Sequence, residues 1–101
     1  MSVLEIRLKN PIDFAAIDQF RMELMEAEHF DYLIIDSGAH DFEAVEAIKY
    51  FRDQFERLEE RLSSFRKVAF VRPTQYRNES TNPDKYDFFD SIEEAKLWFL
   101  I

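Results

Sequence analysis

Polar side chains follow two short apolar runs in the chain. Each of these runs is a candidate strand of a parallel sheet, and ligand sites are common at the ends of such strands. The runs are Tyr32–Ile35 and Val68–Val71, and each is typical of a strand buried on both faces. Parallel α/β sheets bind ligands beyond the carboxyl ends of their strands, at a switch point. We therefore predict a pocket for a small anion, formed by Ser37, Gly38, His40, Arg72 and Thr74. The alternative is a plain turn, in which Gly38 permits the bend and Asp41 caps a helix.

The same segment offers little for metal binding or for hydrolysis. His40 has carboxylates nearby at Asp36, Asp41 and Glu43, but no second histidine lies at ligand spacing. A triad of Ser37, His40 and Asp36 is disfavoured, because nucleophile and base usually come from separate segments. We therefore predict no metal site, no cofactor and no catalytic residues, and we expect the protein not to be an enzyme.

Composition narrows the class of protein further. The chain has 101 residues, the size of one domain spanning 1–101, and 47% of them are hydrophobic, enough for a dense core. A single glycine excludes Gly-rich phosphate loops, and the absence of cysteine excludes disulfides, thiolate zinc sites and cysteine nucleophiles. The net charge of −8 argues against nucleic acid or an anionic membrane as a partner. No signal-peptide pattern and no long apolar run is present, so we expect a cytoplasmic protein without membrane insertion.

The pattern of apolar residues predicts the elements that position these side chains. Strict alternation over Val3–Lys9 indicates an edge strand, and Asn10-Pro11 is suited to start a helix that ends near Glu28. The stripe of this first helix consists of Phe14, Ile17, Phe20, Leu24 and Met25. After the irregular segment 72–85, we predict a strand at Tyr86–Phe89 and a last helix that begins with the Ser91–Glu94 capping box.

A long helix is predicted between the two buried strands, from Phe42 to about Phe65 with Asp41 as its cap. Its apolar positions repeat at steps of four and three, and they are Ala44, Ile48, Phe51, Phe55, Leu58, Leu62 and Phe65. At about 1.5 Å per residue this helix exceeds a typical strand, so it overhangs the sheet, bends or packs on something else. Its apolar face packs either on the sheet or, over the overhanging half, on a second subunit.

Basic residues concentrate at the end of this helix. Residues 49–77 hold eight Lys and Arg against four Asp and Glu, whereas the rest of the chain is strongly acidic. This segment is a candidate contact for an unknown protein partner or for a second copy in a homodimer, through Arg57, Arg61, Leu62, Phe65 and Arg66. The alternative is an ordinary solvated helix end, where the macrodipole favours basic residues.

The predicted order of elements is therefore strand-helix-strand-helix-strand-strand-helix, in an α/β domain with about four mostly parallel strands and three helices.

The last third of the chain carries a resemblance to a known family. Lys67-Val68-Ala69-Phe70-Val71 and the helix Phe89-Asp90-Ser91-Ile92-Glu93-Glu94-Ala95-Lys96-Leu97-Trp98-Phe99 resemble the ending of small bacterial STAS/SEC14-like proteins, which are related in fold to the anti-anti-sigma factor of sporulation. Tyr32–Asp36 then takes the place of the second core strand.

This resemblance implies a STAS-like fold and a non-catalytic interaction or regulatory module. STAS phospho-switches carry a Ser or Thr in a turn that opens the second helix, and the corresponding positions here are Ala44-Val45-Glu46-Ala47. A switch at that turn is therefore not expected, and the leading hairpin strand of the family is missing as well. The alternative function is that of a carrier for a small apolar or anionic ligand, as the kinship with lipid-carrying SEC14-like domains implies.

Overall fold

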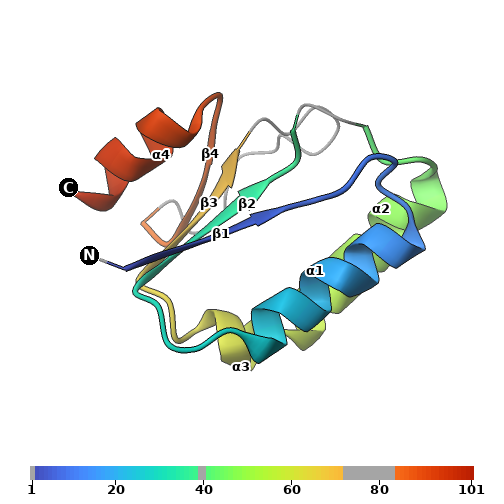
Figure 1. Cartoon of the computed structure of the whole chain (residues 1–101), viewed down its shortest axis with the longest axis horizontal. Helices are drawn as coiled ribbons and strands as arrows, with labels where there is room; N and C mark the ends of the chain where they lie inside the picture. The colour runs from blue at the N-terminus through green and yellow to red at the C-terminus, as the bar shows by residue number, and fades with distance from the viewer. Residues whose placement is uncertain (1, 39–40, 72–83) are drawn as a thin grey trace.

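In the part of the chain that the structure describes, four parallel strands and four helices make up the fold (Figure 1). The computed structural model describes residues 2–38, 41–71 and 84–101. The strands are β1 (Val3–Arg7), β2 (Tyr32–Asp36), β3 (Lys67–Val71) and β4 (Tyr86–Phe89). The helices are α1 (Phe14–Glu26), α2 (Val45–Arg57), α3 (Glu59–Leu62) and α4 (Ile92–Phe99). The predicted α/β class and its parallel sheet are confirmed.

The spatial order of the strands is the same as their order in the chain, β1-β2-β3-β4. All neighbouring pairs are parallel, with Val3 opposite Tyr32, Tyr32 opposite Lys67 and Val68 opposite Tyr86. The two central strands are largely buried, as their uninterrupted apolar runs predict, and β1 lies at the predicted edge. Figure 1 shows α1, α2 and α3 on one face of the sheet and α4 on the other.

The two faces of the sheet carry cores of unequal size. The larger core lies under α1, α2 and α3, and its bulkiest members include Ile17, Phe20, Leu24, Leu33, Phe51, Leu62 and Phe65. The smaller core lies under α4 and consists of Ile34, Ala69, Val71, Ala95 and Phe99. Strand alternation explains the division, because Leu33 and Ile35 point to one face and Ile34 to the other.

The starts of the helices agree only in part with the sequence patterns. Ser91 caps α4 as predicted, since its hydroxyl accepts the Glu94 backbone N–H at 3.2 Å. The prediction that α1 begins at Asn10-Pro11 is wrong. The helix begins at Phe14, where the Asp13 carboxylate accepts the Ala16 N–H at 2.9 Å and takes the role of the cap.

The predicted helix over Phe42–Phe65 is two helices, and it begins later than expected. Phe42 is extended and forms an isolated bridge with Ile12, so α2 starts at Val45 without a side-chain cap from Asp41. The helical path breaks at Leu58, between α2 and α3. The bend brings Leu58 and Leu62 into the chain's own core, which decides the alternatives in favour of packing within the monomer.

Among the described residues, no helix combines the length and the apolar character that crossing a lipid bilayer requires.

Candidate functional site

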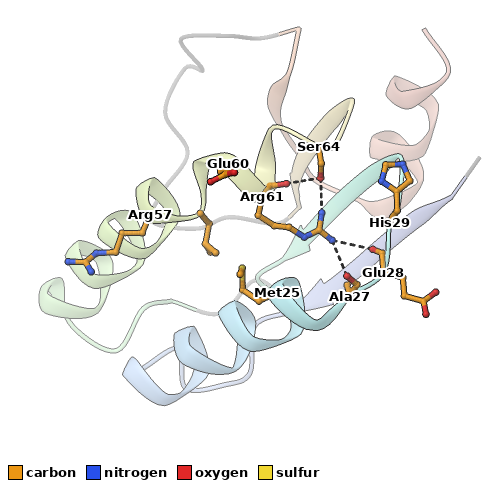
Figure 2. Close-up of a pocket in the computed structure, with 9 residues that line it drawn as sticks. Met25, Ala27, Glu28, His29, Arg57, Glu60, Arg61 and Ser64 are labelled. Atoms are coloured by element: carbon orange, nitrogen blue, oxygen red, sulfur yellow. Dashed lines mark hydrogen bonds between the residues drawn. The ribbon is translucent and has the colours of Figure 1, made fainter.

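A surface groove of about 590 Å³ lies between the end of α1 and the bend that joins α2 to α3 (Figure 2). Its residues come from two short stretches, 25–29 and 57–64, and they are Met25, Ala27, Glu28, His29, Arg57, Leu58, Glu60, Arg61 and Ser64. Leu58 is buried, while the Met25 side chain stands 56% exposed at the groove. Charged residues of both signs, among them Glu60 and Arg57, also line the groove. The groove therefore combines apolar side chains with a rim of mixed charge.

Arg61 builds one wall of this groove by closing the end of α1. Its guanidinium donates to three backbone carbonyls at and just after the end of α1, those of Leu24 at 3.2 Å, Ala27 at 3.3 Å and Glu28 at 3.2 Å. It also donates to the Ser64 hydroxyl at 2.7 Å and lies 4.7 Å from the centre of the Phe65 ring. A cation at this position is favoured by the macrodipole of α1. These contacts join α1 to α3.

The predicted partner-binding residues separate into two groups. Arg57 and Arg61 line the groove, as Figure 2 shows. Leu62 and Phe65 are only 1% and 2% exposed, so the hypothesis that they contact a partner is wrong. They belong to the larger core, together with Leu58 at the break between α2 and α3. Arg66 is exposed next to this region, and its backbone N–H donates to the Asp31 carbonyl at 2.7 Å.

Exposed apolar side chains extend this surface along α1. Phe14 is 50% exposed and Met22 is 49% exposed, although Phe14 and Met25 were predicted to belong to the core stripe of the helix. The Phe14 ring lies 4.7 Å from that of Tyr50 on α2, centre to centre. The Tyr50 hydroxyl donates to the Asp18 carboxylate, and this bond raises the pKa of the phenol. The outer surface of α1 therefore carries three exposed apolar side chains, of which Met25 lines the groove.

The predicted pocket at the carboxyl ends of the strands is described only in part. His40, Arg72 and Thr74 lie outside the described residues. The Ser37 hydroxyl donates to the Val71 carbonyl at 3.2 Å, and the Gly38 N–H donates to the Asp36 carboxylate at 2.8 Å with Gly38 at a φ of 66°. These bonds give Ser37 and Gly38 a structural role in the turn. Among the described strands the order nowhere reverses, so they form no switch point of the kind on which the prediction was based. The pocket itself stays a prediction.

The described part of the chain contains no group of three or more His, Asp or Glu side chains that would hold a metal ion. Comparison of the chain with protein-family models, with curated proteins and with solved structures finds no significant match. The groove and the adjoining helices must therefore be interpreted from their own chemistry.

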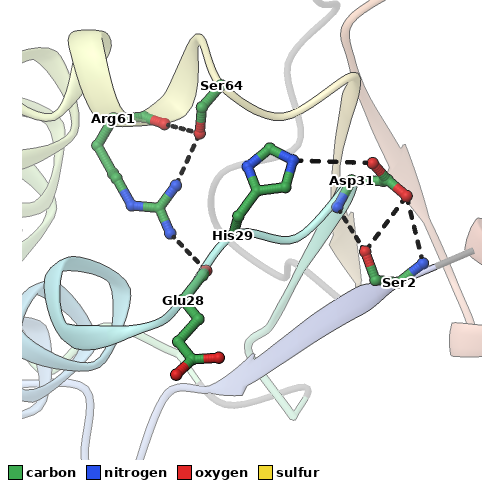
Figure 3. A network of polar contacts seen from close by, with 6 residues as sticks. All are labelled: Ser2, Glu28, His29, Asp31, Arg61 and Ser64. Atoms are coloured by element: carbon green, nitrogen blue, oxygen red, sulfur yellow. Dashed lines mark hydrogen bonds and ion pairs between the residues drawn. The ribbon is translucent and has the colours of Figure 1, made fainter.

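Beyond the groove, a small polar network ties the start of β1 to the start of β2 (Figure 3). The Ser2 hydroxyl donates to the Asp31 carboxylate at 3.2 Å and accepts the Asp31 backbone N–H at 2.9 Å. His29 is exposed, and its Nε2 lies 4.0 Å from the same carboxylate. The pKa of Asp31 lies below its ordinary value, chiefly because of the hydrogen bond from the Ser2 backbone N–H, with the Ser2 hydroxyl and Arg66 adding to the effect.

This lowered pKa predicts a defined pH dependence of stability. The folded protein favours the charged carboxylate, so the contribution of Asp31 is complete above its unfolded pKa, about 4, and is lost as the pH falls through the folded pKa. Wild type is expected to be more stable than an Asp31→Asn variant at pH 6, and the difference should shrink from about pH 4 downward. Urea unfolding midpoints measured from pH 6 to pH 2 test this, with Glu43→Gln as an exposed control. A gap between wild type and Asp31→Asn that stays constant with pH contradicts it.

Proposed function

We propose that the chain is a non-catalytic interaction module, of the STAS-like kind, that binds a partner protein through the outer surface of α1 and the adjoining groove. The observation that carries this proposal is the row of exposed apolar side chains Phe14, Met22 and Met25. At 3.6 residues per turn they fall on one side of α1, away from the buried positions Ile17 and Phe20. Apolar side chains gathered on one exposed face are typical of a contact surface.

The residue types at this surface favour a protein partner. Methionine, aromatic residues and arginine are enriched at the centres of protein interfaces, and Met25, Tyr50 and Arg57 supply one of each. A site for a small anion is less well supported here, since the donors of Arg61 already bind carbonyls of the chain itself. The resemblance of the last third of the chain to STAS-like proteins supports the same class of function.

Site-specific photocrosslinking tests this proposal directly. A photoreactive phenylalanine analogue at Met25 should capture one partner from an extract of the native cells, and the same analogue at Leu97 should not. Leu97 is the matched control, because it is similarly exposed but lies on α4, on the other face of the sheet.

The captured protein is then purified and titrated against three forms of the chain. Met25→Asp should weaken binding at least tenfold, and Leu97→Asp should leave it within twofold of wild type. Equal capture at both positions, or equal binding by both variants, contradicts the proposal. A small molecule retained in native mass spectrometry, without any protein adduct, replaces it with the carrier function.

A further inference from the structure

The outer edge of β1 presents backbone groups that no described strand uses. The Ser2 carbonyl accepts the Tyr32 N–H, and the Leu8 N–H donates to the Asp36 carbonyl. The backbone N–H and C=O groups of the even-numbered residues in this segment therefore face β2. Because the direction of backbone groups alternates along a strand, the N–H and C=O groups of Val3, Glu5 and Arg7 point away from the sheet. Figure 1 shows β1 as the front strand of the sheet. This edge is therefore a template for one more strand.

The side chains of the same residues form a charge pattern that complements itself. Glu5 forms an ion pair with Lys96 of α4 at 3.2 Å, and Arg7 forms one with the buried Asp36 at 3.2 Å. Glu5 remains 44% exposed and Arg7 remains 66% exposed, so both are accessible to a neighbour. Along the edge, a negative and a positive side chain thus stand two residues apart on one face. An identical strand running in the opposite direction presents the same two charges in reverse order.

We propose that two copies of the chain pair through β1 in antiparallel orientation, about a twofold axis at Ile6. This register places Glu5 of each copy opposite Arg7 of the other. Because the backbone N–H and C=O groups of the odd-numbered residues face outward, both Glu5–Arg7 pairs are hydrogen-bonded pairs of the antiparallel ladder. The two four-stranded sheets become one continuous sheet. The pairing uses the edge of the sheet and is independent of the partner surface on α1.

Two consequences of this register favour a second copy over an unrelated strand. First, each new ion pair between the copies extends an ion pair that exists within a copy. The result is a row of alternating charge formed by Asp36 and Arg7 of one copy and by Glu5 and Lys96 of the other. The twofold axis generates this row twice. Charge networks of this kind contribute more than isolated surface pairs. Second, on the opposite face the register aligns Leu4, Ile6 and Leu8 of one copy with the same apolar residues of the other, so no polar side chain is placed beside the larger core, to which Ile6 and Leu8 already belong. A shift by one residue loses both matches.

A charge-swap experiment tests the register. Analytical ultracentrifugation of the purified full chain should show a dimer. Glu5→Arg alone or Arg7→Glu alone should raise the dimer dissociation constant at least tenfold, because like charges then face each other at two places. The double variant E5R/R7E should dimerise more tightly than either single variant, since opposite charges meet again across the interface, but more weakly than wild type, because the pairs with Asp36 and Lys96 are lost. Circular dichroism and thermal unfolding of each variant establish that the monomer is folded.

A backbone variant tests the contribution of the hydrogen bonds when it is compared with Glu5→Ala, which removes the same charge but keeps the N–H. Glu5→Pro removes an N–H that points away from β2, so it leaves the ladder between β1 and β2 intact but takes one hydrogen bond from each side of the dimer. We expect a folded monomer. The matched control Glu93→Pro lies in the first turn of α4, where proline is tolerated, and should remain dimeric. A wild type that is monomeric at all concentrations, or a dimer unaffected by both Glu5→Pro and the single charge reversals, overturns the proposal.

Discussion

Replacing Phe51 with alanine is expected to lower the free energy of unfolding by about 3–5 kcal/mol, the largest effect that we predict for a single side chain. The buried ring lies 5.6 Å from Phe20, 5.5 Å from Phe42 and 5.9 Å from Phe55, centre to centre. It thereby joins α1, α2 and the segment that precedes α2. Since the total stability of a small domain is about 5–15 kcal/mol, a loss of this size removes a large share of it.

Urea unfolding followed by circular dichroism measures this loss. Phe14→Ala is the matched control, because Phe14 also contacts a ring of α2 but is half exposed. Its truncation should cost no more than about 1 kcal/mol. Equal losses for the two variants would mean that the aromatic cluster around Phe51 is not the centre of the larger core.

Arg61→Ala is expected to lower the free energy of unfolding by about 2–3 kcal/mol. The guanidinium donates to the carbonyls of Leu24, Ala27 and Glu28, and its removal leaves the end of α1 without these donors. The loss also separates α3 from α1, because Arg61 joins the two helices. The effect is thus structural, although the residue lies in a segment first considered as a partner contact.

Two further variants separate this role from simple charge. Arg57→Ala removes a neighbouring arginine that forms an exposed ion pair with Asp53 at 3.1 Å, and it should change stability by about 0.5 kcal/mol or less. Arg61→Lys keeps the charge but not the forked donors, so an intermediate loss is expected. If Arg61→Ala and Arg57→Ala are equally stable, the contacts to α1 do not stabilise the fold.

The sheet was largely predictable from sequence because its strands differ sharply in pattern. Tyr32–Ile35 and Val68–Val71 are apolar without interruption and lie at the centre, whereas Val3–Lys9 alternates and lies at the edge. The Ser91 cap was predictable as well, since it depends on two residues at fixed spacing. In each case the information is local, and the tertiary structure does not override it.

The break at Leu58 could not be predicted from periodicity. Leu58, Leu62 and Phe65 keep the same three- and four-residue spacing in the sequence whether the helix continues or breaks, so the apolar pattern does not distinguish the two structures. The start of α2 was missed for a related reason. Phe42 fits the helical stripe, but its backbone is used in the bridge to Ile12, a contact between distant parts of the chain.

The groove was visible in the sequence only as an excess of apolar residues on α1. Ile17, Phe20 and Leu24 suffice to cover the sheet, and Phe14 and Met25 lie on the flank of the same stripe. The only sequence signal for the groove was therefore an apolar stripe on α1 that is wider than the core requires. The hydrogen bonds of Arg61 could not be predicted, because they depend on how closely α3 approaches the end of α1.

The agreement between strand order and chain order has a consequence for synthesis on the ribosome. Each new strand joins the outer edge of those already made, so no strand has to be inserted between two others. The layer of α1 and α2 can therefore assemble on β1, β2 and β3 before the chain is finished. Until α4 emerges, however, the other face of the nascent sheet leaves Ile34, Ala69 and Val71 open to water. When α4 packs on this face, it covers these residues and ends their exposure to chaperones and to aggregation.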